Sequence, residues 1–81
     1  MHKIGTVTHY YDKISVAIVE LTGGIKLGDK IKFVRGGEDL FDQNVDSIQI
    51  EHKEVNAADK GDSVGIKTAK EVKSRAEVFK I

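Results

Sequence analysis

The sequence of 81 residues contains no cysteine, no proline and no tryptophan. The absence of cysteine excludes disulfide bonds, thiolate metal sites and thiol nucleophiles, and a small chain without such cross-links suits a reducing compartment. No uncharged run is long enough to cross a bilayer, and the first residues lack the apolar core of a signal peptide. No stretch rich in proline or serine marks a linker. We therefore expect one cytoplasmic domain over residues 1–81, with no membrane contact.

Neither sign of charge predominates, because 13 Lys and Arg residues balance 13 Asp and Glu residues. A net charge of zero argues against strong, sequence-independent attraction to nucleic acid or to acidic membranes. The distribution is uneven, since residues 1–37 carry +3, residues 38–59 carry −6 and residues 60–81 carry +3. Such segments can neutralise one another across paired strands, or they can leave one basic face on a bipolar molecule.

The chain does contain short apolar runs rich in β-branched residues, and these predict extended strands. Six strands are expected, at Ile4–Tyr11, Lys13–Leu21, Lys30–Arg35, Leu40–Lys53, Ser63–Thr68 and Arg75–Ile81. The first two form a hairpin, with Gly5 at a bulge or a close backbone approach. The second is apolar on both faces, which is typical of a central strand or of one that bends to bury each face in turn. In the fourth, Val45 is out of phase with the apolar residues after it, which indicates a bulge near Asp46–Ser47 or a strand that starts at Ser47.

Glycines mark the turns between these strands. The stretch Thr22–Phe33 ends one apolar run and starts the next, and its Ile25 and Leu27 are spaced to lie on one side and to close one end of a barrel. Residues 54–62 can hold a single helical turn before a second Gly-Asp turn. Structural turn roles are assigned to Gly24, Gly28, Asp29, Gly61 and Gly65.

These strands and turns predict an all-β fold. A closed antiparallel β-barrel is the economical arrangement, because closure removes exposed strand edges in a chain too small to cover them with helices. The alternation places four side chains in its interior, those of Ile31, Phe33, Val64 and Ile66.

A family resemblance comes from four segments that follow one another along the chain. They are Ile4–Val7, Gly24–Ile31, Val45–Ile48 and Val55–Ile66. With them the chain resembles the second domain of the translational GTPases, of which elongation factor Tu and initiation factor 2 are members. The resemblance covers nearly the whole chain but lacks the GTPase domain. It implies a six-stranded closed Greek-key barrel that docks against other domains and against RNA, including the acceptor end of aminoacyl-tRNA.

Motifs for catalysis or cofactor binding are missing from the sequence. Gly23 and Gly28 have the spacing of a phosphate loop, but Asp29 occupies the place of the lysine and would repel a phosphate, so we expect no GTP binding. The three histidines lie far apart, at no metal-ligand spacing, and no serine has the context of a nucleophile elbow. We expect no catalytic residue, no cofactor, no metal and no enzymatic activity.

The remaining candidate surface is basic. The candidate RNA-binding residues are Lys67, Lys70, Lys73 and Arg75, with Tyr10 and Tyr11 as possible stacking groups. The opposing interpretation is a rim of lysines that maintains solubility. The resemblance favours a non-catalytic module that binds RNA, tRNA or the ribosome. The alternative is a protein-docking barrel that acts with a larger enzyme such as a collagenase-like peptidase, because similar barrels are appended to those enzymes. A small-molecule-binding barrel is a third option, and the oligomeric state stays open.

Overall fold

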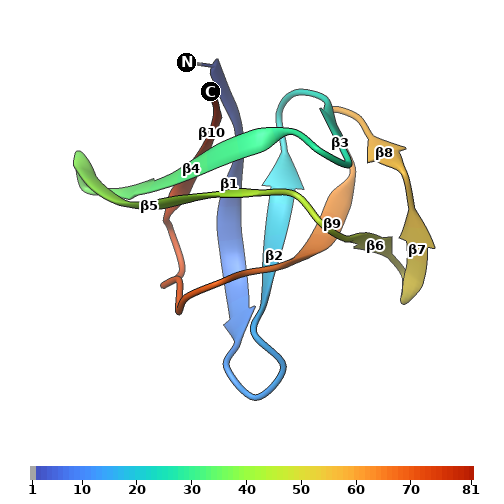
Figure 1. The fold of residues 1–81 in the computed structure, drawn as a ribbon, viewed down its shortest axis with the longest axis horizontal. Coiled ribbons are helices and arrows are strands. Elements are labelled where there is room, and N and C mark those ends of the chain that lie inside the picture. The colour runs from blue at the N-terminus through green and yellow to red at the C-terminus, as the bar shows by residue number, and fades with distance from the viewer. Residues whose placement is uncertain (1) are drawn as a thin grey trace.

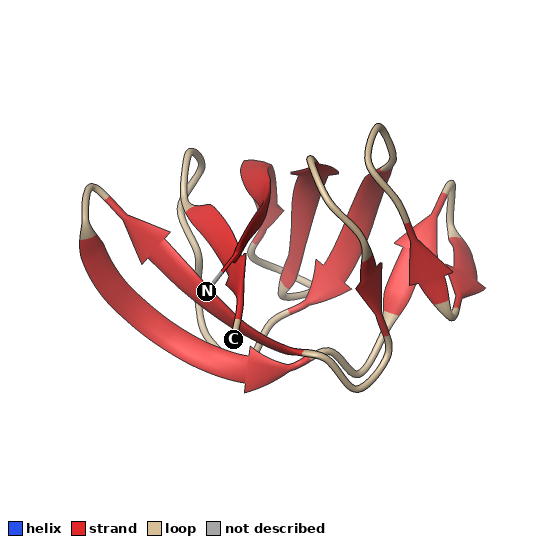
Figure 2. Ribbon diagram, turned by 90° about the horizontal axis from the view of Figure 1, so that it is seen from above, coloured by secondary structure: helices blue, strands red, loops and turns tan. Residues whose placement is uncertain are grey.

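The computed structural model describes residues 2–81, so Met1, where the expected domain begins, lies outside the described residues. The described chain contains ten β-strands (Figure 2). No helix occurs in residues 2–81, and therefore none that could span a membrane. The strands are β1 (His2–Tyr11), β2 (Val16–Leu21), β3 (Ile25–Lys26), β4 (Lys30–Arg35), β5 (Glu38–Asn44), β6 (Ile48–Ile50), β7 (Lys53–Val55), β8 (Ala57–Ala58), β9 (Ser63–Lys67) and β10 (Glu77–Lys80).

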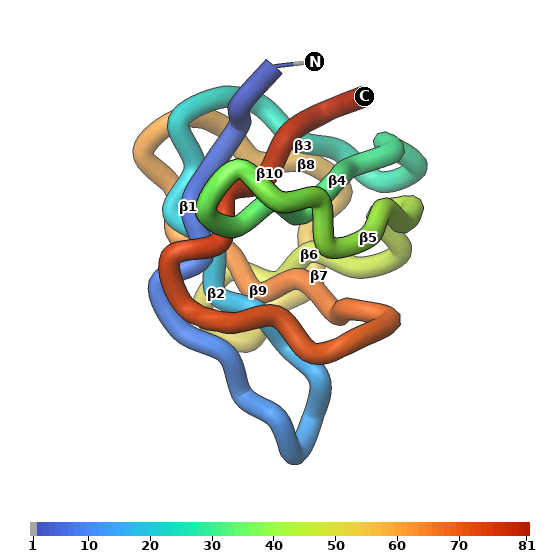
Figure 3. The backbone as a smooth tube through the Cα atoms, turned by 90° about the vertical axis from the view of Figure 1, so that its left-hand side faces the viewer, coloured from blue at the N-terminus to red at the C-terminus, as the bar shows by residue number. Residues whose placement is uncertain are grey.

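Eight strands form one sheet in the order β5-β4-β10-β1-β2-β9-β6-β7, and β3 pairs with β8 as a second, two-stranded sheet. Every pairing is antiparallel. Strand β1 pairs with β2 through a hairpin and with β10 on its other side, so the two ends of the chain lie side by side (Figures 1 and 3). The all-β antiparallel class expected from the sequence is confirmed.

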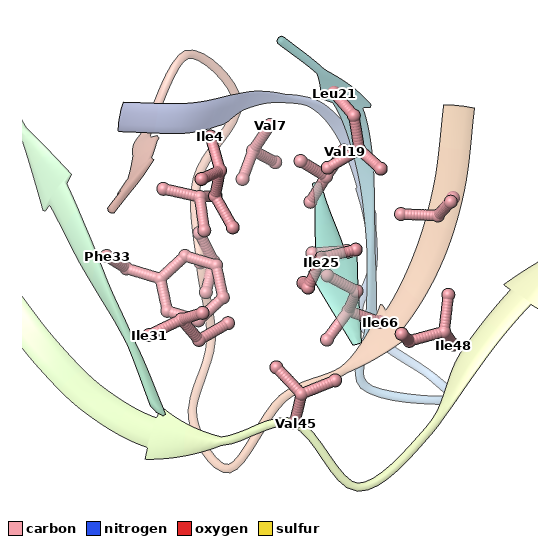
Figure 4. Close-up of a cluster of buried hydrophobic side chains, with 14 of the residues drawn as sticks. Ile4, Val7, Val19, Leu21, Ile25, Ile31, Phe33, Val45, Ile48 and Ile66 are labelled. Atoms are coloured by element: carbon pink, nitrogen blue, oxygen red, sulfur yellow. The ribbon is translucent and has the colours of Figure 1, made fainter. Parts of the chain in front are cut away.

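The large sheet curls, so that strands surround the core (Figure 4). Its two end strands, β5 and β7, are not paired with each other within residues 2–81. The ladder is therefore open, and the six-stranded closed Greek-key barrel expected from the sequence is not found.

The expected fourth strand is divided into β5, β6 and β7, because the backbone leaves the sheet at Val45. The Val45 N–H donates to the Asp29 carbonyl at 2.8 Å, and the Val45 carbonyl accepts from the Gly28 N–H at 2.9 Å. These two bonds tie Val45 to the turn before β4, while its side chain is buried in the core. Regular pairing resumes at Ile48, so the chain has a break between two strands here in place of the expected bulge, and the new strand starts one residue after Ser47. The break carries the chain from one end of the large sheet to the other.

The core consists of aliphatic side chains and one phenylalanine on the inner face of the curled sheet (Figure 4). All four side chains predicted to face inward are fully buried, namely Ile31, Phe33, Val64 and Ile66. Each such side chain contributes about 1.5–3 kcal/mol through removal of its apolar surface from water. Other members include Val7, Val19, Leu21, Ile25, Val45, Ile48, Val72 and Val78.

Two local expectations are wrong. Ile25 is 3% exposed but Leu27 is 40% exposed, so they do not share a side. The reason is that the turn closed by the Asp29 N–H on the Lys26 carbonyl places Leu27 at its outer corner. Residues 54–62 contain β7 and β8 instead of a helical turn, because Ala57 and Ala58 pair with β3.

Two turns of the same design precede β4 and β9. In the first, the Asp29 carboxylate accepts the Lys26 N–H at 3.0 Å, and in the second the Asp62 carboxylate accepts the Asp59 N–H at 3.0 Å. The residue before each aspartate is a glycine, with φ of 89° and 96°. Glycine adopts these angles without the steric cost of a Cβ, which accounts for the two Gly-Asp pairs in the sequence.

The uneven charge of the sequence is partly neutralised between paired strands. Lys32 on β4 binds Asp39 on β5 at 3.1 Å and so joins the basic first segment to the acidic middle one. Two further ion pairs join Lys3 to Glu77 and Lys80 to Asp29.

Candidate functional site

A hollow of about 540 Å³ lies on the outer face of the large sheet. Its lining residues come from the β1–β2 hairpin on one side, from the β6–β7 hairpin on the other and from β9 between them. Figure 1 shows where these strands lie in the fold. We call this hollow the outer groove. It is lined by Tyr11, Ile14, Val16, Ile18, Gln49, Glu51, His52, Ser63, Val64 and Gly65.

The apolar wall of the outer groove follows from the sequence of β2. Alternate residues of this strand, from Ala17 to Leu21, are buried in the core. The residues between them on the outer face begin with Val16 and Ile18, which are also β-branched and apolar. The hairpin tip adds Tyr11, 48% exposed, and Ile14, 60% exposed. Because most outward positions of a half-buried strand are polar, this face is typical of a surface that another molecule covers.

The floor of the groove depends on a missing side chain. Gly65 lies in the middle of β9, and a Cβ at this position would stand 3.2 Å from Val16 Cγ1 and 3.7 Å from Ile18 Cδ1. It would also stand 4.0 Å from the Cβ of Gln49, on the other wall. The bare backbone therefore lets the two walls approach over a flat floor. The turn role assigned to Gly65 from the sequence is not what the structure shows, since this glycine lies within a strand.

Both walls end in strained turns. Ser15 in the β1–β2 turn has φ of 55°, and Glu51 and His52 in the β6–β7 turn have φ of 51° and 66°. A residue other than glycine in this left-handed region costs about 1 kcal/mol or more. The surrounding packing holds the turns in this form, and strain of this kind concentrates at binding sites.

An edge-to-face contact supports the aromatic ring at the groove. The rings of His9 and Tyr11 meet with their centroids 4.4 Å apart. Both residues lie on the outer face of β1, two positions apart. The contact restricts the Tyr11 ring before any ligand arrives, which lowers the entropy cost of binding to it.

One end of the groove is acidic. Glu51 lines the groove at this end, and Glu20 on β2, the register partner of Ser63 on β9, lies just beyond the lining residues. Among residues 2–81 neither glutamate forms an ion pair. No Lys or Arg lines the groove, so its charged groups favour a positively charged ligand at this end.

The four candidate RNA-binding residues do not converge on one hollow. Lys67 lines a hollow beside Gln43 and Thr68, whereas Lys73 lines two others together with Glu71. The Lys70 ammonium lies 6.0 Å from the centre of the Phe41 ring. Arg75 has φ of 73°, and its N–H donates to the carbonyl of Val7, so its backbone has a structural role.

The remaining sequence-predicted positions have structural surroundings. Gly28, Asp29 and Gly61 lie in the two Gly-Asp turns, and Gly24 lies in the bend before β3, next to the Asp59 carboxylate. In the part of the chain that the structure describes, no three His, Asp or Glu side chains lie close enough to hold a metal ion.

Comparison with known proteins connects this fold to peptidases. The chain is 42% identical over 65 residues to a protein of Methanocaldococcus jannaschii named an uncharacterized protease, a match that covers 80% of this chain and 16% of that protein. The crystal structure of the C-terminal domain of a candidate U32 peptidase from Geobacillus thermoleovorans superposes with a TM-score of 0.90 and 22% identity, over 99% of this chain and 92% of that one. This chain has the fold of that C-terminal domain.

The selenomethionine variant of the same Geobacillus thermoleovorans domain superposes equally well. Its TM-score is 0.89 at 21% identity, over 96% of this chain and 98% of that one. No protein-family model matches the chain.

These similarities correct the family resemblance. The identification with the second domain of the translational GTPases is wrong, because the similar proteins are named as peptidases. The RNA-binding interpretation depended on that resemblance and loses its support. The matched segments consist mostly of turn glycines and buried aliphatic residues, which many small antiparallel sheets need for their geometry. Such residues indicate the shape of the backbone and contain no information about the molecule that the domain binds.

The outer groove was missed at the level of sequence, although a signal for it exists. The apolar character of both faces of β2 predicted burial of each face. The structure buries one face in the core and leaves the other half-exposed in the groove. A strand that is apolar on both faces and lies next to an interior strand glycine, here Gly65, is the pattern that could have indicated a docking face.

Proposed function

We propose that the chain is a non-catalytic docking module that acts together with the catalytic part of a larger peptidase. The match to the Methanocaldococcus jannaschii protease covers only 16% of that protein, so most of that protein lies outside the matched region. The Geobacillus thermoleovorans domain of the same fold is the C-terminal part of a candidate peptidase. A small domain attached to a larger enzyme contributes binding surface, and this chain has such a surface in the outer groove.

The observation that supports this proposal most strongly is the exposed apolar wall of the groove. Tyr11, Ile14, Val16 and Ile18 present adjacent apolar side chains to water, next to a floor without a side chain at Gly65. Burial of this surface against a second protein releases the water that covers it, which favours association. Tyrosine is among the residues that dominate binding energy at protein interfaces.

The apolar interior of the molecule supports a non-catalytic role. The buried side chains of the core point into the space that the curled sheet encloses (Figure 4). The histidines that line hollows, His9 and His52, lie on the surface. Chemistry at a peptide bond would therefore come from the partner.

We further propose that the sheet behaves as a closed, rigid unit although its ladder is open. The Gln43 amide nitrogen donates to the Lys67 carbonyl at 2.9 Å, and its amide oxygen accepts the Ala69 N–H at 2.7 Å. This side chain joins β5 to the end of β9. A rigid unit loses little conformational freedom on docking, which supports binding.

Calorimetric titration tests the docking function. The chain is titrated into the isolated catalytic domain of a U32-type peptidase from the same organism. We expect a saturable one-to-one isotherm with a negative heat-capacity change, because apolar surface is buried. The replacement Ile18→Ser in the groove weakens binding, whereas Leu40→Ser on β5 serves as the control and leaves it unchanged. Absence of binding by the unmodified chain contradicts the proposed function.

A further inference from the structure

We infer that the outer groove binds a protein segment that presents a bulky apolar side chain next to a lysine or arginine. This inference rests on the proposed docking function and specifies the chemistry of the surface that enters the groove. It follows from the order in which apolar and acidic groups are arranged along β2 and β9.

The groove changes character along its length. The strand register places Val16 beside Lys67, Ile18 beside Gly65 and Glu20 beside Ser63. At the hairpin end the lining side chains are those of Tyr11, Ile14 and Val16, and Lys67 of β9 lies beside Val16 at its margin. The far end is acidic.

The apolar end fits a large side chain. Its hollow forms part of a space of about 540 Å³, enough for more than a single methyl group. Val16 and Ile18 pack over the backbone of Gly65, and the Tyr11 ring contacts His9. A bulky aliphatic or aromatic side chain can pack on the apolar surface that Ile18 and the Tyr11 ring offer.

The acidic end fits a cation. Glu51 lines the groove, and Glu20 follows Val16 and Ile18 on the outer face of β2, beside Ser63 and just beyond the lining residues. Both glutamates are exposed and form no ion pair among the described residues. The hydroxyl of Ser63 and the amide of Gln49 add oxygen acceptors nearby. An ammonium or guanidinium group from the partner meets complementary charge here, whereas an acidic segment is repelled.

Charge reversal tests this inference. The double variant Glu20→Lys with Glu51→Lys is titrated into the same catalytic domain of a U32-type peptidase, in parallel with the unmodified chain. The matched control is Glu38→Lys with Asp42→Lys, two exposed acids on β5 at the other end of the sheet. We expect the groove variant to lose about tenfold or more in affinity and the control to change by less than about twofold.

The outcomes separate the inference from the docking function. If the unmodified chain binds and the two double variants bind equally well, the inference is wrong and the docking function remains. If the unmodified chain does not bind, the docking function fails together with the inference. A second variant, Ile14→Ser, probes the apolar end and is expected to weaken binding, because Ile14 is 60% exposed and does not support the core. Unchanged affinity of Ile14→Ser also contradicts the inference.

Discussion

At the scale of single residues, close backbone approaches determine where this chain tolerates a side chain. A Cβ at Gly5 would stand 2.5 Å from Val19 Cγ1 and 2.9 Å from the Glu20 carbonyl oxygen. The register between β1 and β10 shifts at the same residue. The sequence predicted a bulge or a close approach here, and both are present. Glycine is therefore required at this position because there is no room for a Cβ atom, and not because the backbone has a left-handed φ.

The substitution Gly5→Ala is expected to lower the free energy of unfolding by about 2 kcal/mol, because a methyl group forced into a packed site causes backbone shifts. Urea denaturation measures this loss. Gly23→Ala is the matched control, since its Cβ would make only ordinary contacts, the nearest at 3.5 Å from Ile4. A similar loss for both variants would show that close packing at Gly5 is not the cause.

The two Gly-Asp turns differ in burial, and this difference predicts different costs. Asp29 is 8% exposed, accepts the Lys26 N–H and lies 3.3 Å from the Lys80 ammonium. Asp62 makes the same turn bond but is only half-buried. We expect Asp29→Ala to cost about 2 kcal/mol and Asp62→Ala about 1 kcal/mol, because a buried donor left unpaired is the more expensive. Equal shifts of the two denaturation curves would contradict this explanation.

At the scale of elements, the β6–β7 and β4–β5 hairpins have the same backbone turn but different residues in it. Residues 51 and 52 form a two-residue loop between β6 and β7, and both have positive φ although they are Glu and His. Residues 36 and 37 form the equivalent loop between β4 and β5 and are both glycine. Positive φ at both positions is the signature of a type I′ turn, in which Asn-Gly is favoured.

An exchange of these turn sequences tests whether the β6–β7 turn is strained. Glu51→Asn with His52→Gly is expected to raise the free energy of unfolding by about 1 kcal/mol, because the left-handed angles lose their steric cost. Gly36→Glu with Gly37→His is expected to lower it by a similar amount, since a Cβ at either position would have no atom within 4 Å and only the backbone angle matters. Thermal unfolding of both variants shows whether the free energy of unfolding rises or falls in each. A destabilised Asn-Gly variant would show that the side chains of Glu51 and His52 support the fold.

The side chain of Gln43 joins β5 to the end of β9, and the strength of this link can be tested. Gln43→Ala removes the acceptor of the Ala69 N–H, a bond of 2.7 Å. Amide hydrogen exchange at Ala69 is therefore expected to accelerate, whereas Gln49→Ala, an exposed position on β6, leaves it unchanged. Unchanged exchange at Ala69 in Gln43→Ala would mean that this bond does not hold β5 to the end of β9.

Strands in which apolar and polar residues alternate regularly could be predicted from the sequence. Strands that end because of a contact with a distant part of the chain could not. The bounds of β4 agree with the expected strand because Ile31 and Phe33 alternate with lysines. The sequence indicated a bulge near Asp46–Ser47 or a strand that starts at Ser47, but it did not show that Val45 pairs with Gly28 and Asp29, which are distant in sequence. Alternation within a segment contains no information on such a partner.

At the scale of the whole molecule, the all-β class could be predicted from local patterns of apolar and polar residues. Closure of the sheet and the function of the chain could not. Whether an eight-stranded sheet closes depends on its end strands. Here the end strands β5 and β7 are not paired among the described residues, and the Gln43 side chain joins β5 to the end of the interior strand β9. The candidate site depends on side chains from three strands that meet only in the fold, around Gly65. Basic residues that looked like a group in the sequence, such as Lys67 and Lys73, lie in separate hollows.

The most direct test of docking through the outer groove is hydrogen–deuterium exchange of the chain alone and in the presence of the catalytic domain of a U32-type peptidase. Docking at the groove predicts slower exchange in residues 11–18 and 49–52, the two walls, with little change in β5 at the far end of the sheet. Protection confined to β4 and β5, or no protection while the two proteins are shown to bind, would contradict a docking surface at the outer groove.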